Sequence, residues 1–273
     1  MKSRIFQIPS NPKLITMAFK EIGIAIAIAG LFSSCCKNIY YVNDPVVFAN
    51  VKDKSDFNLA GGLNLGTKTG GLHFNGNVAI SDNLFLSGSF TQYSGSCKST
   101  TTINGNTTDN SKFYSGNSYL GSIGYYKGLG NEFYFEGSFG GKYGTNNNKK
   151  GEETFNFHHA KYFLQPAITY NRTHFQAGLG LRFGLIDFLP HSSTHQVISP
   201  NVADKGPLPF LDPSLFICGG GKHVKVGCQI SSTIAEYASI AYSPFGILFS
   251  SAALDPLSLS VFLRVTFPDK DLK

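Results

Sequence analysis

The chain is short of charge. Only 15% of its 273 residues are Asp, Glu, Lys or Arg, whereas soluble globular proteins usually carry about 25%. Glycine, at 30 residues, exceeds its usual share of about 7%. A soluble surface needs interspersed lysine and glutamate, so this composition indicates that much of the apolar surface faces something other than water.

The N-terminal apolar run is also too short for a membrane helix. The run from Ile22 to Phe32 falls below the about 20 residues that span a bilayer. Basic residues precede it and small residues follow, which is the order of an export signal. We therefore predict an export signal over residues 1–36, starting at Met1 or Met17. Its end, Leu31-Phe-Ser-Ser-Cys35, resembles a bacterial lipobox, so Cys35 and Cys36 are candidate lipidation sites, with ordinary signal cleavage as the alternative.

Neither charge nor cysteine content indicates a specific partner. The segment before Cys35 holds four of the 23 basic and one of the 17 acidic residues, which leaves 19 − 16 = +3 for the remainder. This excess predicts no nucleic-acid partner. Cys97, Cys218 and Cys228 remain beyond the signal, and an odd number is not a disulfide framework. Cys218 and Cys228 are predicted on adjacent strands but opposite faces, so we expect no bridge.

Motifs of catalysis and cofactor binding are missing. The sequence has no GxSxG and no phosphate-binding loop. His158, His159, His191 and His195 all fall in predicted loops; the spacing of the last two would suit a metal only on a helix. We therefore expect no metal, no cofactor and no enzymatic activity, with a membrane-lipid hydrolase as the alternative.

From Asp56 onward, apolar and polar residues alternate with period two, which predicts strands with unlike faces. Ten stretches follow this rule, with a bulge expected near His158. They lie at residues 56–65, 72–80, 84–91, 118–126, 132–143, 155–170, 174–185, 215–217, 223–230 and 257–267. The stretch Ala235 to Asp255 stays unassigned, so twelve strands are the alternative.

The connections are of two kinds. Tight-turn sequences lie at 81–83, 128–131, 171–173 and 220–222. Longer loops are expected at 97–109, 145–152 and 188–211, and only 67–70 is short on that side. Short turns at one end and long loops at the other are typical of outer-membrane barrels, whose short turns are periplasmic. The fold class predicted is a closed, all-β, antiparallel up-and-down transmembrane barrel of about ten strands.

The polar face supports a membrane location, since it holds mainly Ser, Asn, Thr, Gln and Gly rather than Lys and Glu. A soluble periplasmic ligand-binding barrel, with its apolar face inward, is the alternative. The chain resembles small, poorly characterised outer-membrane β-barrel proteins with a lipobox-like cysteine and a lead such as Tyr40-Tyr-Val-Asn-Asp-Pro45. The resemblance implies an extended periplasmic lead over 37–54, a barrel over 55–267 and a tail over 268–273. It further implies contact with outer-membrane lipid, and recognition by the barrel-assembly machinery through the last strand, which ends at Phe267.

Charged residues on the polar face predict a network in the lumen. Its members are Glu132, Glu136, Lys142, Lys161, Arg182, Lys225 and Arg264. Barrels of about 8 strands are filled by side chains, whereas aqueous channels need 16 or more, so we interpret this network as a plug. The function expected is structural, or surface interaction through the long extracellular loops with an unidentified partner. A narrow channel for small solutes is the alternative.

Overall fold

The computed structural model describes residues 41–42, 44–66, 69–97, 100–103, 106–109, 111–150, 153–189, 206–235, 254–255 and 257–267. All of them belong to one compact unit, Cys36–Lys273. The predicted export signal, with Cys35 and Cys36, lies outside the described residues, as do most of the unassigned stretch Ala235 to Asp255 and the tail after Phe267. Within the described part of the chain, no helix has the length and apolarity to cross a membrane.

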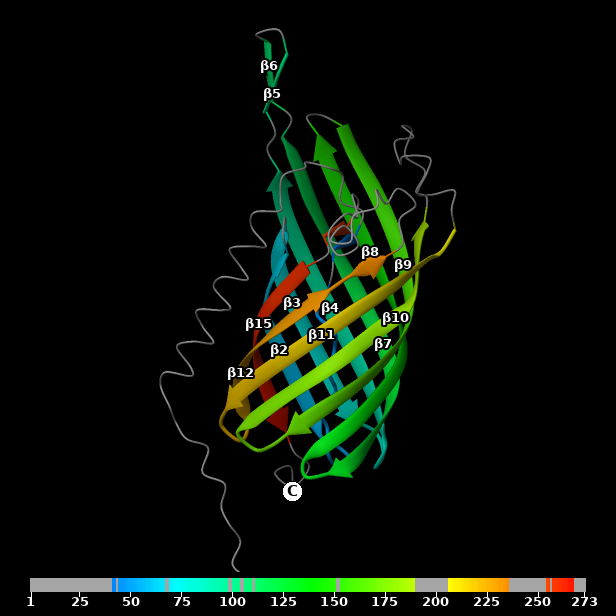
Figure 1. The fold of residues 1–273 in the computed structure, drawn as a ribbon, viewed down its shortest axis with the longest axis vertical. Coiled ribbons are helices and arrows are strands. Elements are labelled where there is room, and N and C mark those ends of the chain that lie inside the picture. Colours follow the sequence, from blue (N-terminus) through cyan, green and yellow to red (C-terminus); the bar gives the residue numbers. More distant parts are fainter. Residues whose placement is uncertain are drawn as a thin grey trace, which may run out of the picture. The chain divides into compact units, whose positions relative to one another are not determined.

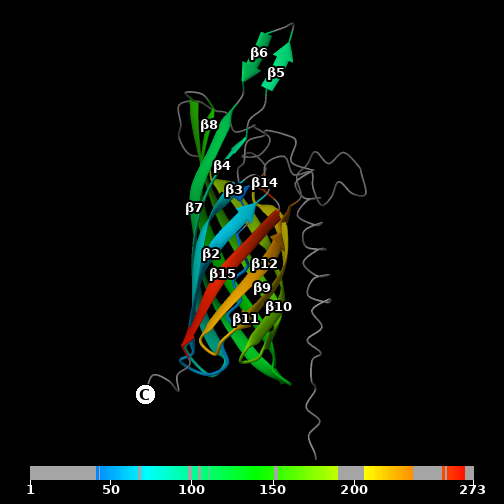
Figure 2. The same ribbon diagram turned by 90° about the vertical axis from the view of Figure 1, so that its left-hand side faces the viewer.

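Ten strands form a closed antiparallel barrel (Figures 1 and 2), as predicted. They are β2 Phe57–Gly66, β3 Thr69–Ala79, β4 Leu84–Cys97, β7 Lys112–Gly130, β8 Phe133–Lys150, β9 Glu153–Asn171, β10 Phe175–Leu189, β11 Leu208–Gly220, β12 Val224–Ser232 and β15 Leu257–Phe267. Each pairs with its neighbour in the chain, β15 pairs with β2, and β10 with β11.

Five short strands complete the described structure. The strands β5 Thr100–Ile103 and β6 Asn106–Asp109 form a hairpin between β4 and β7. The two-residue strand β13 Ile234–Ala235 pairs with β11 beyond the end of β12. The two-residue strand β1 Tyr41–Val42 pairs in parallel with β14 Leu254–Asp255.

The barrel is apolar outside and polar inside. Exposed apolar residues occur on every wall strand: Leu59, Phe74, Leu86, Ile123, Phe139, Leu164, Leu179, Ile217, Val226 and Leu263. Buried polar residues face the lumen from the same strands: Asn64, Asn77, Ser87, Ser118, Ser138, Gln165, Gln176, Ser214, Gln229 and Ser260. A membrane requires this distribution, together with a closed ladder that leaves no backbone group unpaired in lipid. The soluble barrel with an apolar interior is therefore excluded.

The predicted tight turns all lie at one end, called here the short-turn end. They join β3 to β4, β7 to β8, β9 to β10 and β11 to β12. The opposite, long-loop end differs from the sequence prediction in two places. β8 continues to Lys150 where a loop was expected from Thr145, and β11 begins at Leu208 although 188–211 was expected as a loop. Proline made β11 hard to predict from the sequence, because proline is unfavourable inside a sheet. Beside Pro213, the pairing of β11 with β12 stops, and β11 pairs with β13 instead.

The bulge expected near His158 is also absent from the described ladder. β9 keeps one register with β8 from Tyr170 to Glu153. Its pairing with β10 skips Pro166 and resumes in the same register, because proline has no N–H to donate. The register shift lies elsewhere, in β7 between Gly128 and Gly130.

Candidate functional site

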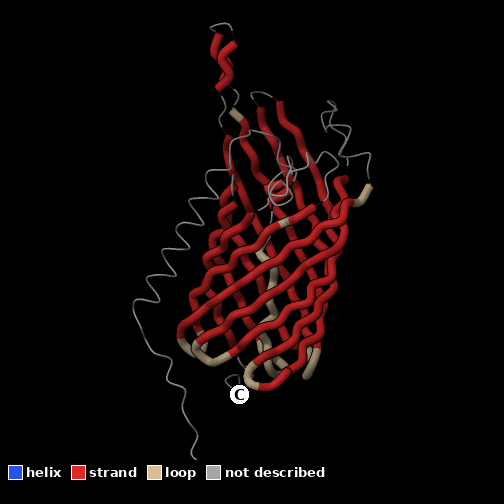
Figure 3. The backbone as a smooth tube through the Cα atoms, in the orientation of Figure 1, coloured by secondary structure: helices blue, strands red, loops and turns tan. Residues whose placement is uncertain are grey.

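The lumen contains the segment Asp44 to Val51, called here the lead, all of it buried (Figure 3). Tyr41–Val42 pairs with Leu254–Asp255, just before β15 starts at the long-loop end. From the lead, the chain continues to Asp56, which precedes the first residue of β2 at the short-turn end. The resemblance implied an extended periplasmic lead over residues 37–54. The structure places residues 44–51 within the lumen, entered from the long-loop end.

Side chains of the wall satisfy the backbone of the lead. Carbonyl oxygens of six consecutive residues, 45 to 50, each accept a hydrogen bond from a wall side chain. The donors, in that order, are Arg182, Gln229, Gln165, Asn77, Asn58 and Asn171, at 3.3, 3.0, 2.6, 3.3, 2.6 and 3.2 Å. A buried carbonyl without a partner costs about 1–3 kcal/mol. The amide-rich polar face therefore replaces the strand ladder that the lead lacks.

Apolar contacts also hold the lead. Val46 and Phe48 join a buried cluster that includes Phe216, Phe262 and Cys218. The rings of Phe48 and Phe216 have centroids 4.4 Å apart. Nearer the short-turn end, Ala49 and Val51 pack against Ala79, Phe85 and Tyr126. The lumen is thus filled by the lead and by side chains together.

Glu136 on β8 binds the lead at two successive backbone amides. Its Oε2 accepts from Ala49 N at 2.9 Å and its Oε1 from Asn50 N at 3.0 Å. The hydroxyl of Thr169 donates to Oε1 at 3.1 Å. Asn50 has φ 49°, in the left-handed region that asparagine adopts more readily than most residues. Hydrogen bonds to charged groups are the strong ones, so Glu136 is the main polar clamp on the lead.

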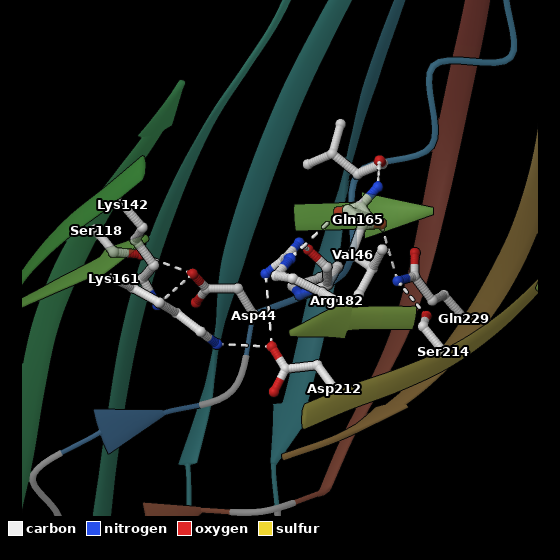
Figure 4. A network of polar contacts seen from close by, with 12 residues as sticks. Asp44, Val46, Ser118, Lys142, Lys161, Gln165, Arg182, Asp212, Ser214 and Gln229 are labelled. Carbon is white, nitrogen blue, oxygen red and sulfur yellow. Dashed lines mark hydrogen bonds and ion pairs between the residues drawn. The ribbon is translucent and has the colours of Figure 1, made fainter. Parts of the chain in front are cut away.

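A second polar group lies nearer the long-loop end (Figure 4). Asp44 of the lead contacts Lys142 Nζ at 2.5 Å and accepts from the Ser118 hydroxyl at 3.2 Å. Asp212 on β11 contacts Lys161 Nζ at 2.6 Å and Arg182 Nη1 at 3.8 Å. All of the paired carboxylate and cationic side chains are at most 2% exposed. Lys161 also lies 3.7 Å from the centre of the Phe210 ring. We call Lys142, Lys161 and Arg182 the cation cluster.

Six of the seven residues of the predicted lumen network are buried inside the barrel. Glu136, Lys142, Lys161, Arg182, Lys225 and Arg264 are buried on the inner side of the wall. Arg264 donates to Gln176 Oε1 at 3.0 Å and stacks near Phe216 and Phe262, each 5.3 Å from the guanidinium carbon. Lys225 donates to the carbonyl of Lys222 in the adjacent turn at 3.3 Å, so it lies apart from the cation cluster.

Glu132 does not belong to this network. It is the second residue of the turn between β7 and β8, with φ 67°, and it lies 3.9 Å from exposed Arg172. In the sequence, the alternation of polar and apolar residues extends one position before β8 and so includes Glu132. In the structure, Asn131 and Glu132 have positive φ angles, so the strand begins only at Phe133. The exposed position makes Glu132 a solvated turn residue.

Sequence reasoning missed other members of the site. Asp44 and Asp212 supply the carboxylates of the cation cluster. Asp44 precedes the alternating region, and Asp212 lies between the expected loop 188–211 and the predicted strand 215–217. His158 and His159, also expected in a loop, lie on β9, where His159 is buried and His158 contacts the Tyr143 hydroxyl at 2.6 Å. His191 and His195 lie outside the described residues. Cys218 and Cys228 are free, as predicted.

No family model matches the chain, and no curated protein matches its sequence. Solved structures of outer-membrane barrels resemble it at low similarity. OmpT, an outer membrane protein of Vibrio cholerae, is 11% identical, with TM-score 0.32 over 79% of this chain and 62% of that chain. A second OmpT structure is covered over 56% of its length, so this chain spans less than two thirds of both.

Two other matched structures are covered almost completely. The NanC porin is 8% identical, with TM-score 0.35 over 78% of this chain and 99% of that chain. The TodX monoaromatic hydrocarbon channel is 6% identical, with TM-score 0.31 over 84% and 94%. Scores this low transfer no site to this chain. Among the described residues, no group of three His, Cys, Asp or Glu side chains could hold a metal ion.

Proposed function

We propose that this chain is a non-enzymatic outer-membrane β-barrel protein that is closed at rest by its own lead and acts through its long-loop end on the cell surface. The observation that carries the proposal is the buried lead, with six backbone carbonyls bonded to wall side chains. A lumen filled in this way does not serve as an open pore. The short-turn end would then be periplasmic.

The long-loop end supports a surface role. β7 and β9 have 19 residues and β8 has 18, whereas about 9–11 residues cross a bilayer as a tilted strand. These three neighbours therefore extend well past the membrane on one side, the side on which the β5–β6 hairpin connects β4 to β7 (Figure 2). Long strands with polar ends offer a rigid platform for a partner outside the cell.

Two measurements test the proposal. In cell fractionation, the full chain should be recovered with the outer membrane and should migrate differently on a gel before and after boiling. In planar bilayers, the native protein should give no steady single-channel current. Recovery in the soluble fraction, or a steady open conductance of the native protein, would overturn it.

A narrow channel is the second candidate function. It is favoured by the way the lead is held, since within the described part of the chain its backbone bonds to side chains and belongs to no strand ladder of the wall. Withdrawal of the lead would break no wall hydrogen bond. Replacing residues 44–51 with a Gly/Ser sequence of equal length should then give single-channel steps that the native chain lacks, and silence of this variant in a correctly folded barrel would count against the channel.

The last strand of the barrel is a candidate signal for assembly in the membrane. We propose that β15, whose Phe267 ring stacks on Phe57 at 5.9 Å, is the strand recognised by the barrel-assembly machinery. Phe267→Ala should lower the amount of folded protein in the outer membrane, whereas Val261→Ala, an apolar change in mid-strand, should not. Equal amounts for the two variants would overturn this assignment.

A further inference from the structure

The cation cluster contains an unfavourable arrangement of the wall. Lys142 on β8 and Lys161 on β9 lie directly opposite each other in the ladder, and like charges in opposite positions destabilise a sheet. Both are buried, at 4% and 0% exposure. Such a pair requires an anion for each ammonium group, because an unpaired buried charge is strongly destabilising.

The two anions come from different parts of the structure. Asp212 is fixed in the wall opposite Arg182 and serves Lys161 and Arg182. Asp44 is on the lead and serves Lys142. Among the described residues, the cation cluster contacts two carboxylates, one from the wall and one from the lead. Asp44 thus supplies Lys142 with a negative charge that does not belong to the wall.

At this position the wall also supplies a hydrogen-bond donor. The hydroxyl of Ser118 on β7 donates to the same Oδ2 that contacts Lys142. Asp44 Oδ1 has no hydrogen-bond partner among the described residues. One ammonium and one hydroxyl, both from the wall, thus bind one oxygen of a carboxylate carried by an element that is not part of the wall.

We infer that Lys142 and Ser118, within the cation cluster, form a carboxylate-binding site of the lumen, filled by Asp44 in the closed barrel and by the carboxylate of a small acidic solute when the lead is withdrawn. This inference rests on the narrow channel proposed above as the second function. The ligand class is a carboxylate because the occupant in the closed state is itself one. Asp44 acts as a built-in competitor of the solute.

Chemical rescue tests the site without requiring conductance. The full-length Asp44→Gly variant should lose its folded, heat-modifiable form at a lower temperature than the native chain. Sodium formate should recover most of this loss in a saturable way, whereas sodium chloride at equal ionic strength should not. If Asp44→Gly does not fold in chloride, its refolding yield in formate against chloride is the readout.

Two variants complete the design. Asp53→Asn removes an exposed carboxylate that follows the lead and should not respond to formate. Asp44→Gly combined with Lys142→Met removes the cation, and the formate effect should disappear. An equal response to formate and chloride in Asp44→Gly, or a formate response that survives the loss of Lys142, would overturn the carboxylate site.

Conductance separates this inference from the function on which it rests. Rescue of Asp44→Gly by formate without any current in a bilayer would support the site and overturn the channel. Current through Asp44→Gly without rescue would support the channel and overturn the site.

Discussion

Replacing Glu136 by glutamine should loosen the lead while leaving the wall intact. Glutamine keeps one oxygen to accept from the backbone, but its amide group faces the second backbone N–H with a donor. The native carboxylate accepts from both Ala49 N and Asn50 N, and each hydrogen bond to a charged group contributes about 1.5–3 kcal/mol. Since one bond is lost and the other weakened, we expect the free energy that holds the lead to fall by about 2–4 kcal/mol.

A native thiol reports this change. Cys218 is 3% exposed and belongs to the cluster that contains Val46 and Phe48 of the lead. In a chain whose four other cysteines are serine, labelling of Cys218 by a small polar maleimide requires displacement of the lead. Since about 1.4 kcal/mol is a tenfold change in an equilibrium, Glu136→Gln should label roughly 30 to 700 times faster than the parent.

The control is the same substitution on the same hairpin. Glu132→Gln changes an exposed turn residue that touches no part of the lead, and its labelling rate should equal that of the parent. A Glu136→Gln rate within about twofold of the parent, in a barrel that still shows the gel shift, would refute Glu136 as a clamp, because about 0.4 kcal/mol is all that such a ratio represents.

Further predictions concern stability, measured as the free energy of unfolding in denaturant or the temperature at which the heat-modifiable form is lost. Phe48→Ala removes the ring packed on Phe216 and should cost about 3–5 kcal/mol; a cost below about 1 kcal/mol would mean that the ring is not buried in solution. Asn58→Ala leaves a lead carbonyl without its 2.6 Å donor and should cost about 1–3 kcal/mol. By contrast, Glu132→Gln and Arg172→Gln, which remove an exposed pair 3.9 Å apart, should each change stability by less than about 0.5 kcal/mol, and a larger loss would contradict the solvated turn.

The wall was predictable because its signal is local. Leu179, Leu181, Phe183 and Leu185 alternate with smaller or polar residues, and each strand pairs with its neighbour in the chain. The strand number, the closed topology and the tight turns follow from this pattern. Strand ends were less accurate, since β8 and β9 continue beyond the bilayer, where no apolar face is required and polar residues such as Asn146 and Asn147 read as loop.

The lead was not predictable in the same way. Val46 to Val51 is apolar without a period, and its partners are about 9 to 183 residues away in the chain, as the bonds from Asn58 to Ala49 and from Gln229 to Val46 show. The one available signal was the amide content of the polar face. A lumen that filled itself with paired charges would not need donors such as Gln165 and Asn77; these donors indicate an acceptor-rich backbone inside.

The mode of attachment decides which element of this barrel can move. Removing any wall strand would expose unpaired N–H and C=O groups to hydrocarbon, which costs several kcal/mol for each group. Removing the lead exposes side-chain donors such as Gln229 and Asn171, which water in the lumen can satisfy, and the apolar side chains that pack on Val46 and Phe48. The main electrostatic cost falls on Lys142, which loses Asp44, and on Glu136, which loses two backbone amides. Both of these costs fall when ions or solutes enter the lumen. A carboxylate at Lys142 and a donor at Glu136 would therefore shift the equilibrium toward the open barrel, so occupancy of the lumen and position of the lead are coupled.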